Sequence, residues 1–250
     1  MIQSQFGYTK PYYTFCREEQ NVVALLYSLL LNNSSNLKMF LEFLKIKTTK
    51  INTANSELYF EYAYVRDLWH QFTSKNIKQR IKNNDTKRNF ILSYINSKKI
   101  KIDNTIKNNS SIEEFNNYFG CRAKSKEHIE SPSNWSVLKI KENIYDNFNE
   151  KKDFIELCKF KWSFNIKPDL IIKLDMNRVI CIEAKLESNE SSYPSNSKEK
   201  NIWDEIFGKK KNRVKQTDMQ KHMLSEIIGF EDINMFMIDS TKWSTIFKLF

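Results

Sequence analysis

The sequence predicts an α/β fold, with a mostly helical N-terminal region at residues 1–135 and a mixed-sheet core flanked by helices at residues 136–250. In the first half, apolar residues recur at the 3.6-residue spacing of helices. In the second half, short runs dense in β-branched residues are followed by a helix and another such run. This order of strands and helices is typical of an α/β layer architecture.

The first half is predicted to consist of helices. Their expected ranges are 14–31, 37–44, 56–72 and 87–96, and the run of Asn and Ser at 32–36 separates the first two. Aromatic residues at 59–69 are expected to pack helices rather than to stack on bases. Residues 73–110 are poor in apolar side chains and predict a surface excursion, whose part 75–101 carries a local charge of +8.

The second half is predicted to begin with a helix at 141–160 and a short strand at Trp162–Phe164. Two strong strand candidates follow, and then a loop at 187–201. A helix at 213–228, stopped by Gly229, leads to a last strand at 233–238. The two strong strand candidates cover 168–174 and 178–185.

Composition excludes several classes of protein. The chain has 250 residues but only 4 glycines, so it cannot contain a Gly-rich phosphate loop. Its 4 cysteines have neither zinc-site spacing nor a disulfide pattern, which indicates a reducing compartment. The longest apolar run, 22–31, is too short to span a bilayer. We therefore expect a cytoplasmic protein without a membrane partner.

The charge is ambiguous on its own. The formal net charge of +10 suggests a polyanionic partner. However, 33 of the 40 basic residues are Lys and the chain has 27 Asn, a bias that an AT-rich coding sequence also produces. The basic segment 198–215 is the better candidate for phosphate contacts, because it follows the strand pair and precedes a helix with two Gln residues.

Charged residues interrupt the two strong strand candidates, and three of them are candidates for a site: Asp169, Glu183 and Lys185. Charged groups in apolar strands are costly unless they are paired or bind a metal. Glu183 and Lys185 are two residues apart and share a face. With a three-residue loop at 175–177, Asp169 falls opposite Glu183, whereas a two-residue turn would separate them. We predict the longer loop, with Asn177 in the left-handed region, or an equivalent bulge.

Two adjacent carboxylates are suited to Mg²⁺, for which Mn²⁺ can substitute, with water and phosphate oxygens completing the coordination. Such an ion lowers the pKa of a bound water and neutralises charge on phosphorus. Lys185 beside it could orient that water or help to deprotonate it, and could stabilise the transition state. The set suits hydrolysis of a phosphodiester bond.

The stretch Pro168-Asp169, thirteen residues, then Glu183-Ala184-Lys185 resembles the PD-(D/E)XK nuclease superfamily, which has the restriction-endonuclease-like fold. The resemblance covers roughly residues 140–240. It implies that Asp169 and Glu183 bind the metal and that Lys185 is the catalytic lysine.

The resemblance implies further site residues. Many members add an acidic residue from a preceding helix, and four residues qualify here: Glu18, Glu19, Glu142 and Glu156. RecB-like members carry a Gln and then a Tyr four residues later. This chain has Gln216 and Gln220, but Leu224 stands where that Tyr would be. The two Gln residues are still expected to face the metal site.

The sequence thus predicts a Mg²⁺-dependent endonuclease acting on double-stranded DNA, with a role in type II restriction or another form of prokaryotic defence, and capable of forming a homodimer. Two alternatives stay open. One is a nuclease for RNA or for branched or damaged DNA. The other is a non-catalytic nucleic-acid-binding protein on a decayed nuclease fold.

Overall fold

A computed structural model describes residues 18–47, 53–73, 76–121, 126–186 and 189–250. Its contacts divide the chain into two compact units. The first unit combines Met1–Tyr62, Lys167–Glu190 and Leu224–Phe250, and the second combines Ala63–Ile166 and Ser191–Met223. This division differs from the expected boundary between residues 135 and 136, because a strand near residue 60 pairs with a strand of the expected core.

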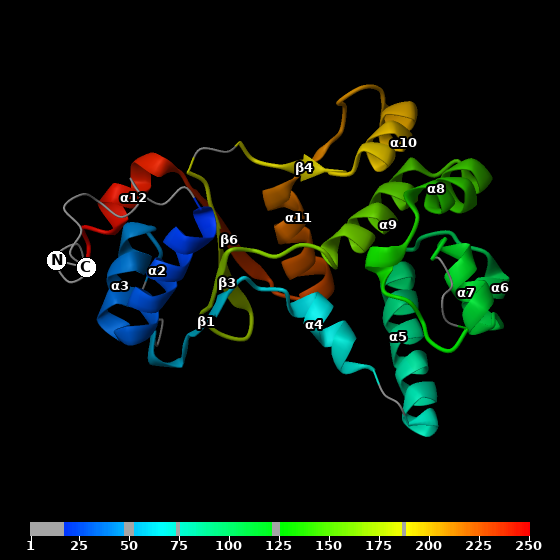
Figure 1. Cartoon of the computed structure of the whole chain (residues 1–250), viewed down its shortest axis with the longest axis horizontal. Helices are drawn as coiled ribbons and strands as arrows, with labels where there is room; N and C mark the ends of the chain where they lie inside the picture. The colour runs from blue at the N-terminus through cyan, green and yellow to red at the C-terminus, as the bar shows by residue number, and fades with distance from the viewer. Residues whose placement is uncertain (1–17, 48–52, 74–75, 122–125, 187–188) are drawn as a thin grey trace. The chain divides into compact units, whose positions relative to one another are not determined.

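The first unit is built on a small mixed sheet of four strands in the order β1-β2-β3-β6 (Figure 1). The strands are β1 (Glu57–Phe60), β2 (Leu170–Lys173), β3 (Arg178–Ala184) and β6 (Asp232–Ile238). β2 pairs antiparallel with both β1 and β3, and β6 runs parallel to β3. A parallel pair requires a crossover connection, which the chain between β3 and β6 supplies.

Three helices pack on one face of this sheet: α2 (Glu19–Asn32), α3 (Ser34–Phe43) and α12 (Ser240–Ile246) (Figure 1). Asn33 ends α2 and caps α3 by accepting a hydrogen bond from the backbone N–H of Ser35 at 2.8 Å. The helices bury apolar side chains against every second residue of β2 and β3, as the two-residue period of strands requires. The unit is thus a mixed α/β structure, as predicted.

The β2–β3 hairpin has the predicted register. Leu170 pairs with Ile182, and the Leu174 backbone N–H donates to the Arg178 carbonyl at 3.0 Å, which leaves residues 175–177 as the loop. The expectation that Asn177 adopts a left-handed conformation was wrong, since it is not among the described residues with positive φ. The Asp175 carboxylate shapes the loop instead, by accepting from the backbone N–H groups of Asn177 at 3.0 Å and Arg178 at 2.9 Å.

The second unit is mainly helical, with a two-stranded antiparallel ribbon. Its elements are α4 (Tyr64–Gln71), α5 (Ile77–Ser97), α6 (Asn104–Asn108), α7 (Ile112–Tyr118), η3 (Pro132–Asn134), α8 (Val137–Ile140), η4 (Lys141–Asp146), α9 (Lys151–Ser163), β4 (Ser192–Tyr193), α10 (Ser197–Phe207), β5 (Val214–Lys215) and α11 (Gln216–His222).

The predicted helix at 56–72 was wrong in its first part. Residues Glu57–Phe60 form β1, and only Tyr64–Gln71 are helical. The ladder with β2 continues past the strand, because the backbone N–H of Glu61 donates to the Asp169 carbonyl at 2.9 Å. Glu61 then turns the chain with a φ of 50°. Tertiary pairing therefore overrides the helical spacing of the aromatic residues.

The expectation of a surface excursion at 73–110 was also wrong, since 77–97 form the 21-residue helix α5. This helix buries polar as well as apolar side chains. The Asn84 side chain donates to the Glu127 carbonyl at 2.7 Å and accepts from the Ile129 backbone N–H at 3.0 Å. Asn residues in a sequence indicate a surface, but Asn84 is buried because its hydrogen bonds are satisfied within the fold. This explains why the segment was predicted to lie at the surface.

Three further expectations need correction. The helix predicted at 141–160 is interrupted where Asn149 adopts a φ of 54°, and Trp162 and Ser163 end α9 rather than form a strand. The loop predicted at 187–201 already contains β4 and the start of α10. The helix predicted at 213–228 begins at Gln216, changes to the π-helical turn η5 (Met223–Ile228), and stops at Gly229 as expected.

The prediction for the first helix is confirmed from Glu19 onward, and its expected start at residue 14 lies outside the described residues. Within the described ranges, none of the helices has the length and apolar character that crossing a bilayer would need.

Candidate active site

Asp169 stands at the start of the β2–β3 hairpin, opposite Glu183 in the register of the pair. Its Oδ2 accepts a hydrogen bond from the backbone N–H of Ala184 at 2.8 Å. This bond joins the first half of the sequence motif to the second, because Ala184 stands between Glu183 and Lys185. The juxtaposition that the three-residue loop predicted is therefore present.

Glu183 and Lys185 lie on and directly after β3 and are almost fully buried, with exposed fractions of 1 % and 8 %. The Lys185 ammonium lies 2.8 Å from the Glu183 carboxylate, so the pair is joined by a salt bridge. The Lys185 backbone N–H donates to the Ile238 carbonyl at 2.8 Å, which extends the pairing with β6. Both side chains are thus fixed by the central strand of the sheet.

Glu19, in the first turn of α2, completes the cluster. Its Oε2 lies 3.3 Å from the Lys185 ammonium, and its Oε1 accepts from the Leu186 backbone N–H at 3.1 Å. Of the four acidic residues that the sequence left open, Glu19 contacts the motif. Glu142 pairs with Lys139, and Glu156 with Lys159, in the second unit.

Burial raises the pKa of Asp169 from its usual 3.8 to about 7, and the neighbouring negative charge of Glu183 adds to this effect. The hydrogen bond from Ala184 and the charge of Lys185 oppose the rise, while the charge of Glu19 supports it. Two carboxylates held together in a partly desolvated place therefore compete for one cation, Lys185.

Burial by itself lowers the pKa of Lys185, but its hydrogen bond to Glu183 and the charges of Glu183 and Glu19 outweigh burial and raise the pKa. The lysine is therefore an ammonium at neutral pH. As such it donates hydrogen bonds and supplies positive charge.

The donor set fits a magnesium ion in its chemistry. Mg²⁺ typically takes only one or two carboxylates from a protein and keeps several waters, so Asp169 and Glu183 suffice as protein ligands. The structure, over its described ranges, holds no group of three or more His, Cys, Asp or Glu side chains arranged to bind a metal. A cation at this place would therefore depend on water or substrate oxygens for most of its ligands.

The two Gln residues expected at the site belong to the second unit, in α11. Gln220 is fully buried and Gln216 is half-buried. The site carboxylates belong to the first unit, so the role expected for the two Gln residues stays a prediction.

Cys181 shares the strand face of Glu183 and is fully buried, and burial raises the pKa of its thiol. It is therefore a core residue and not a nucleophile.

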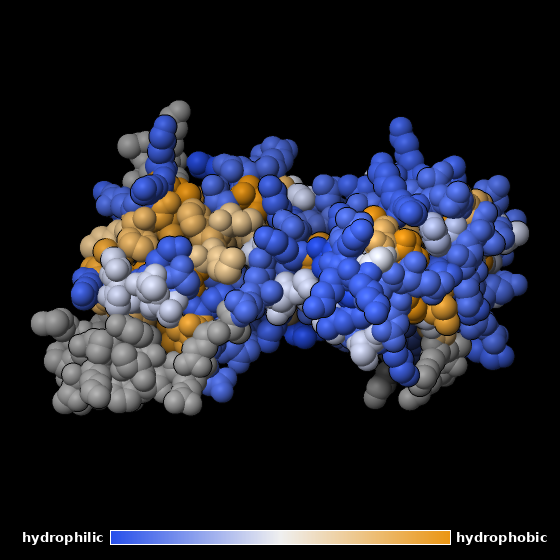
Figure 2. Space-filling model, turned by 90° about the horizontal axis from the view of Figure 1, so that it is seen from above, coloured by the Kyte–Doolittle hydropathy of each residue, from blue (hydrophilic) through white to orange (hydrophobic). Residues whose placement is uncertain are grey.

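The basic segment 198–215 presents mostly exposed lysines. Figure 2 shows that hydrophilic residues cover much of the face seen there, with apolar patches between them. Arg213 forms an ion pair with Asp204, which fixes the turn after α10. The exposed lysines of the segment are Lys198, Lys200, Lys209, Lys210, Lys211 and Lys215.

Comparison of the chain with protein-family models, curated proteins and solved structures finds no significant match.

Proposed function

We propose that the protein is a Mg²⁺-dependent nuclease that hydrolyses phosphodiester bonds of DNA. The observation that carries the proposal is the convergence of Asp169, Glu183 and Lys185 at one end of a buried hairpin. Burying two carboxylates next to each other is unfavourable unless they serve a cation, and here burial and mutual repulsion hold one of them at a raised pKa.

Asp169 and Glu183 would hold the ion, which when bound would neutralise phosphate charge and lower the pKa of an attacking water. Lys185 would donate to the attacking water or to a non-bridging phosphate oxygen, where negative charge grows in the transition state. Its ammonium form, favoured by Glu183 and Glu19, suits this role.

Glu19 would act as a positioning residue for Lys185. It contacts both the ammonium and the backbone N–H of the next residue, so it fixes the end of β3 and the lysine together. In this respect it takes the place of the additional acidic residue that the resemblance to the PD-(D/E)XK superfamily implies.

A nucleic-acid substrate is supported by the charge distribution. The exposed lysines of 198–215 offer contacts to phosphates, which fix a duplex without reading its sequence. A homodimer would bring two such sites to the two strands of a duplex. A sedimentation experiment with and without DNA tests this part of the proposal.

Cleavage by purified protein tests the activity directly. Supercoiled plasmid, linear duplex, single-stranded DNA and RNA would be incubated with Mg²⁺, Mn²⁺ or Ca²⁺. We expect cleavage of DNA with Mg²⁺ or Mn²⁺, and a loss of about 10²-fold or more in rate for Asp169→Asn, Glu183→Gln and Lys185→Met.

The sheet offers a matched control. Lys173 and Glu57 form an ion pair of 2.6 Å on β2 and β1 of the same unit, away from the motif. We expect Lys173→Met and Glu57→Gln to cleave at the wild-type rate. Equal activity of the Lys173→Met and Lys185→Met variants would overturn the assignment of the site. Preferred cleavage of RNA would support the assigned site but replace DNA by RNA as the proposed substrate. Binding of DNA without cleavage would favour a non-catalytic nucleic-acid-binding protein.

A further inference from the structure

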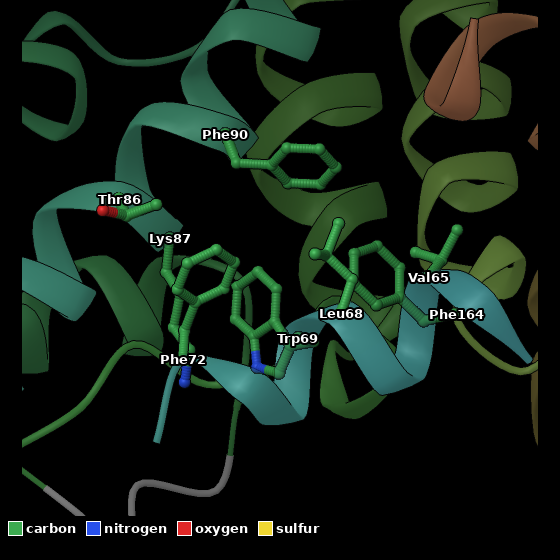
Figure 3. A pocket seen from close by; sticks show the side chains of 8 residues that line it. All are labelled: Val65, Leu68, Trp69, Phe72, Thr86, Lys87, Phe90 and Phe164. Atoms are coloured by element: carbon green, nitrogen blue, oxygen red, sulfur yellow. The ribbon is translucent and has the colours of Figure 1, made fainter. Parts of the chain in front are cut away.

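The second unit contains an apolar pocket of about 120 Å³ between α4, α5 and the end of α9 (Figure 3). Its floor consists of buried side chains and its rim of half-buried ones. The floor includes Trp69, Lys87 and Phe164, and the rim includes Leu68, Phe72 and Phe90. The pocket thus opens through a mostly apolar rim, and Trp69, Phe164 and Lys87 close it below.

The aromatic rings come from three elements. Trp69 of α4 meets Phe164 at the end of α9 edge to face, with ring centroids 5.5 Å apart, and Phe90 of α5 meets Phe164 edge to face at 6.4 Å. Figure 3 shows the rings of Phe90 and Trp69 directed towards the same space from two helices. Aromatic faces around a small apolar space favour a planar ring as the occupant.

Lys87 places a positive charge against one wall. Its side chain is 5 % exposed, and its ammonium lies 4.9 Å from the centre of the Trp69 ring. It forms no ion pair with the residues that the structure describes. Burial lowers the pKa of Lys87, and the charge of Glu130 only partly opposes this. A cationic ligand is therefore disfavoured here, although aromatic cages often bind cations.

The rim continues into a basic stripe of α5. Lys78, Lys82, Thr86 and Phe90 follow at four-residue spacing, so they lie along one side of the helix, about 6 Å apart along its axis. Lys78 and Lys82 are exposed and form no ion pair within the described part of the chain, while Thr86 and Phe90 belong to the rim. Positive charge therefore leads directly to the mouth of an aromatic pocket.

We propose that this pocket receives one unstacked base of a single-stranded stretch of nucleic acid, while Lys78 and Lys82 contact the adjoining phosphates. Aromatic platforms next to cationic side chains are how proteins bind single strands. The walls offer apolar surface and few hydrogen-bonding groups, so the base is held by stacking and the pocket tolerates all four bases. The inference rests on the proposed function, because it assumes a nucleic-acid substrate.

Fluorescence of 2-aminopurine tests the pocket. Oligonucleotides with this base in a single-stranded or a duplex segment would be titrated with the protein in EDTA, so that no cleavage occurs. We expect quenching on binding for the single-stranded probe, and weaker binding by about tenfold when Leu68→Trp fills the pocket. Leu138→Trp, at an exposed position of α8, is the matched control and should bind as the wild type does.

Two further variants separate the parts of the proposal. Phe90→Leu removes an aromatic ring from the rim with little change in volume, and it should also reduce the quenching. It therefore tests the pocket even if Leu68→Trp does not fold. The double variant Lys78→Ala with Lys82→Ala should weaken the salt dependence of binding. The slope of log K against log salt concentration should become less steep by about one to two. The exposed pair Lys151→Ala with Lys152→Ala on α9 is its control, for which we expect a smaller change.

The outcomes are distinguishable. Quenching that persists unchanged in Leu68→Trp and in Phe90→Leu would overturn the base pocket and leave the nuclease proposal intact. The base pocket would likewise be overturned if the duplex probe bound as tightly as the single-stranded probe and showed equal quenching. Binding to none of the probes would overturn the base pocket, whereas failure to cleave any DNA or RNA substrate with Mg²⁺ or Mn²⁺ would overturn the nuclease proposal.

Discussion

Asp169 has an environment unlike that of an ordinary carboxyl group. Its pKa is about 7 in the folded chain and 3.8 as its usual value, so the folded state binds the proton more tightly. The corresponding stability is fully present below pH 3.8 and is lost as the pH rises through about 7. In the metal-free protein, Asp169 therefore destabilises the fold at pH 8 relative to pH 5.

We expect the free energy of unfolding of the metal-free protein to fall by about 1–3 kcal/mol between pH 5 and pH 8 because of this group. Asp169→Asn should remove most of that fall, whereas Glu57→Gln should leave it unchanged. Urea denaturation at the two pH values measures the effect. A pH dependence that is equal in wild type and Asp169→Asn would show that the carboxyl is ionised as usual.

Lys87 is a second unusual residue, because its buried ammonium forms no ion pair with any residue in the described ranges. We expect Lys87→Met to raise the free energy of unfolding at pH 7 by about 1 kcal/mol. This is a net value, because the variant no longer buries an unpaired charge but also loses the contact between Lys87 and Trp69. Because the folded pKa lies below the usual 10.5, the stability of the wild type should rise as the pH approaches that value. The advantage of the variant should therefore shrink at pH 10, and the exposed Lys82→Met should show neither effect.

At the scale of elements, the β2–β3 hairpin depends on a side chain in its loop. Asp175 accepts from two backbone N–H groups and pairs with Arg178 at 2.6 Å, whereas Asn177 needs no left-handed conformation. We expect Asp175→Ala to lower the urea midpoint more than Asn177→Gly does. If Asn177→Gly instead raised the midpoint clearly, the loop would prefer a positive φ at residue 177.

The same hairpin shows what could be predicted from the sequence. The strands at 168–174 and 178–185 are dense in β-branched residues and close in sequence, so both their type and their register could be predicted, and with them the meeting of Asp169 and Glu183. β1 could not, because its partner β2 lies 116 residues away at the Glu57–Lys173 pair and its aromatic residues have helical spacing. Glu19 is 166 residues from Lys185, so local patterns could not select it from four candidates.

At the scale of the whole molecule, the sheet depends on segments from both ends of the chain. The core of the first unit combines α2, α3, β2, β3, β6 and α12. A fragment comprising 136–250 keeps α12 but lacks β1 and both N-terminal helices, so one edge and part of one face of its sheet would be uncovered. We expect this fragment to be insoluble or to lack a cooperative thermal transition, as measured by circular dichroism. A cooperative transition would show that residues 136–250 fold alone.

The pairing of β1 with β2 also has a consequence for the order of events during biosynthesis. The ribosome releases α2, α3 and β1 early, but β2 follows only after more than a hundred further residues, and the α12 residues Trp243 and Ile246 emerge last. Throughout that interval the apolar faces of the nascent helices have no sheet to cover them. The second unit, whose segment 63–166 is continuous, can begin to fold meanwhile. Production of this protein should therefore respond strongly to chaperones that bind nascent chains and to slower translation at low temperature.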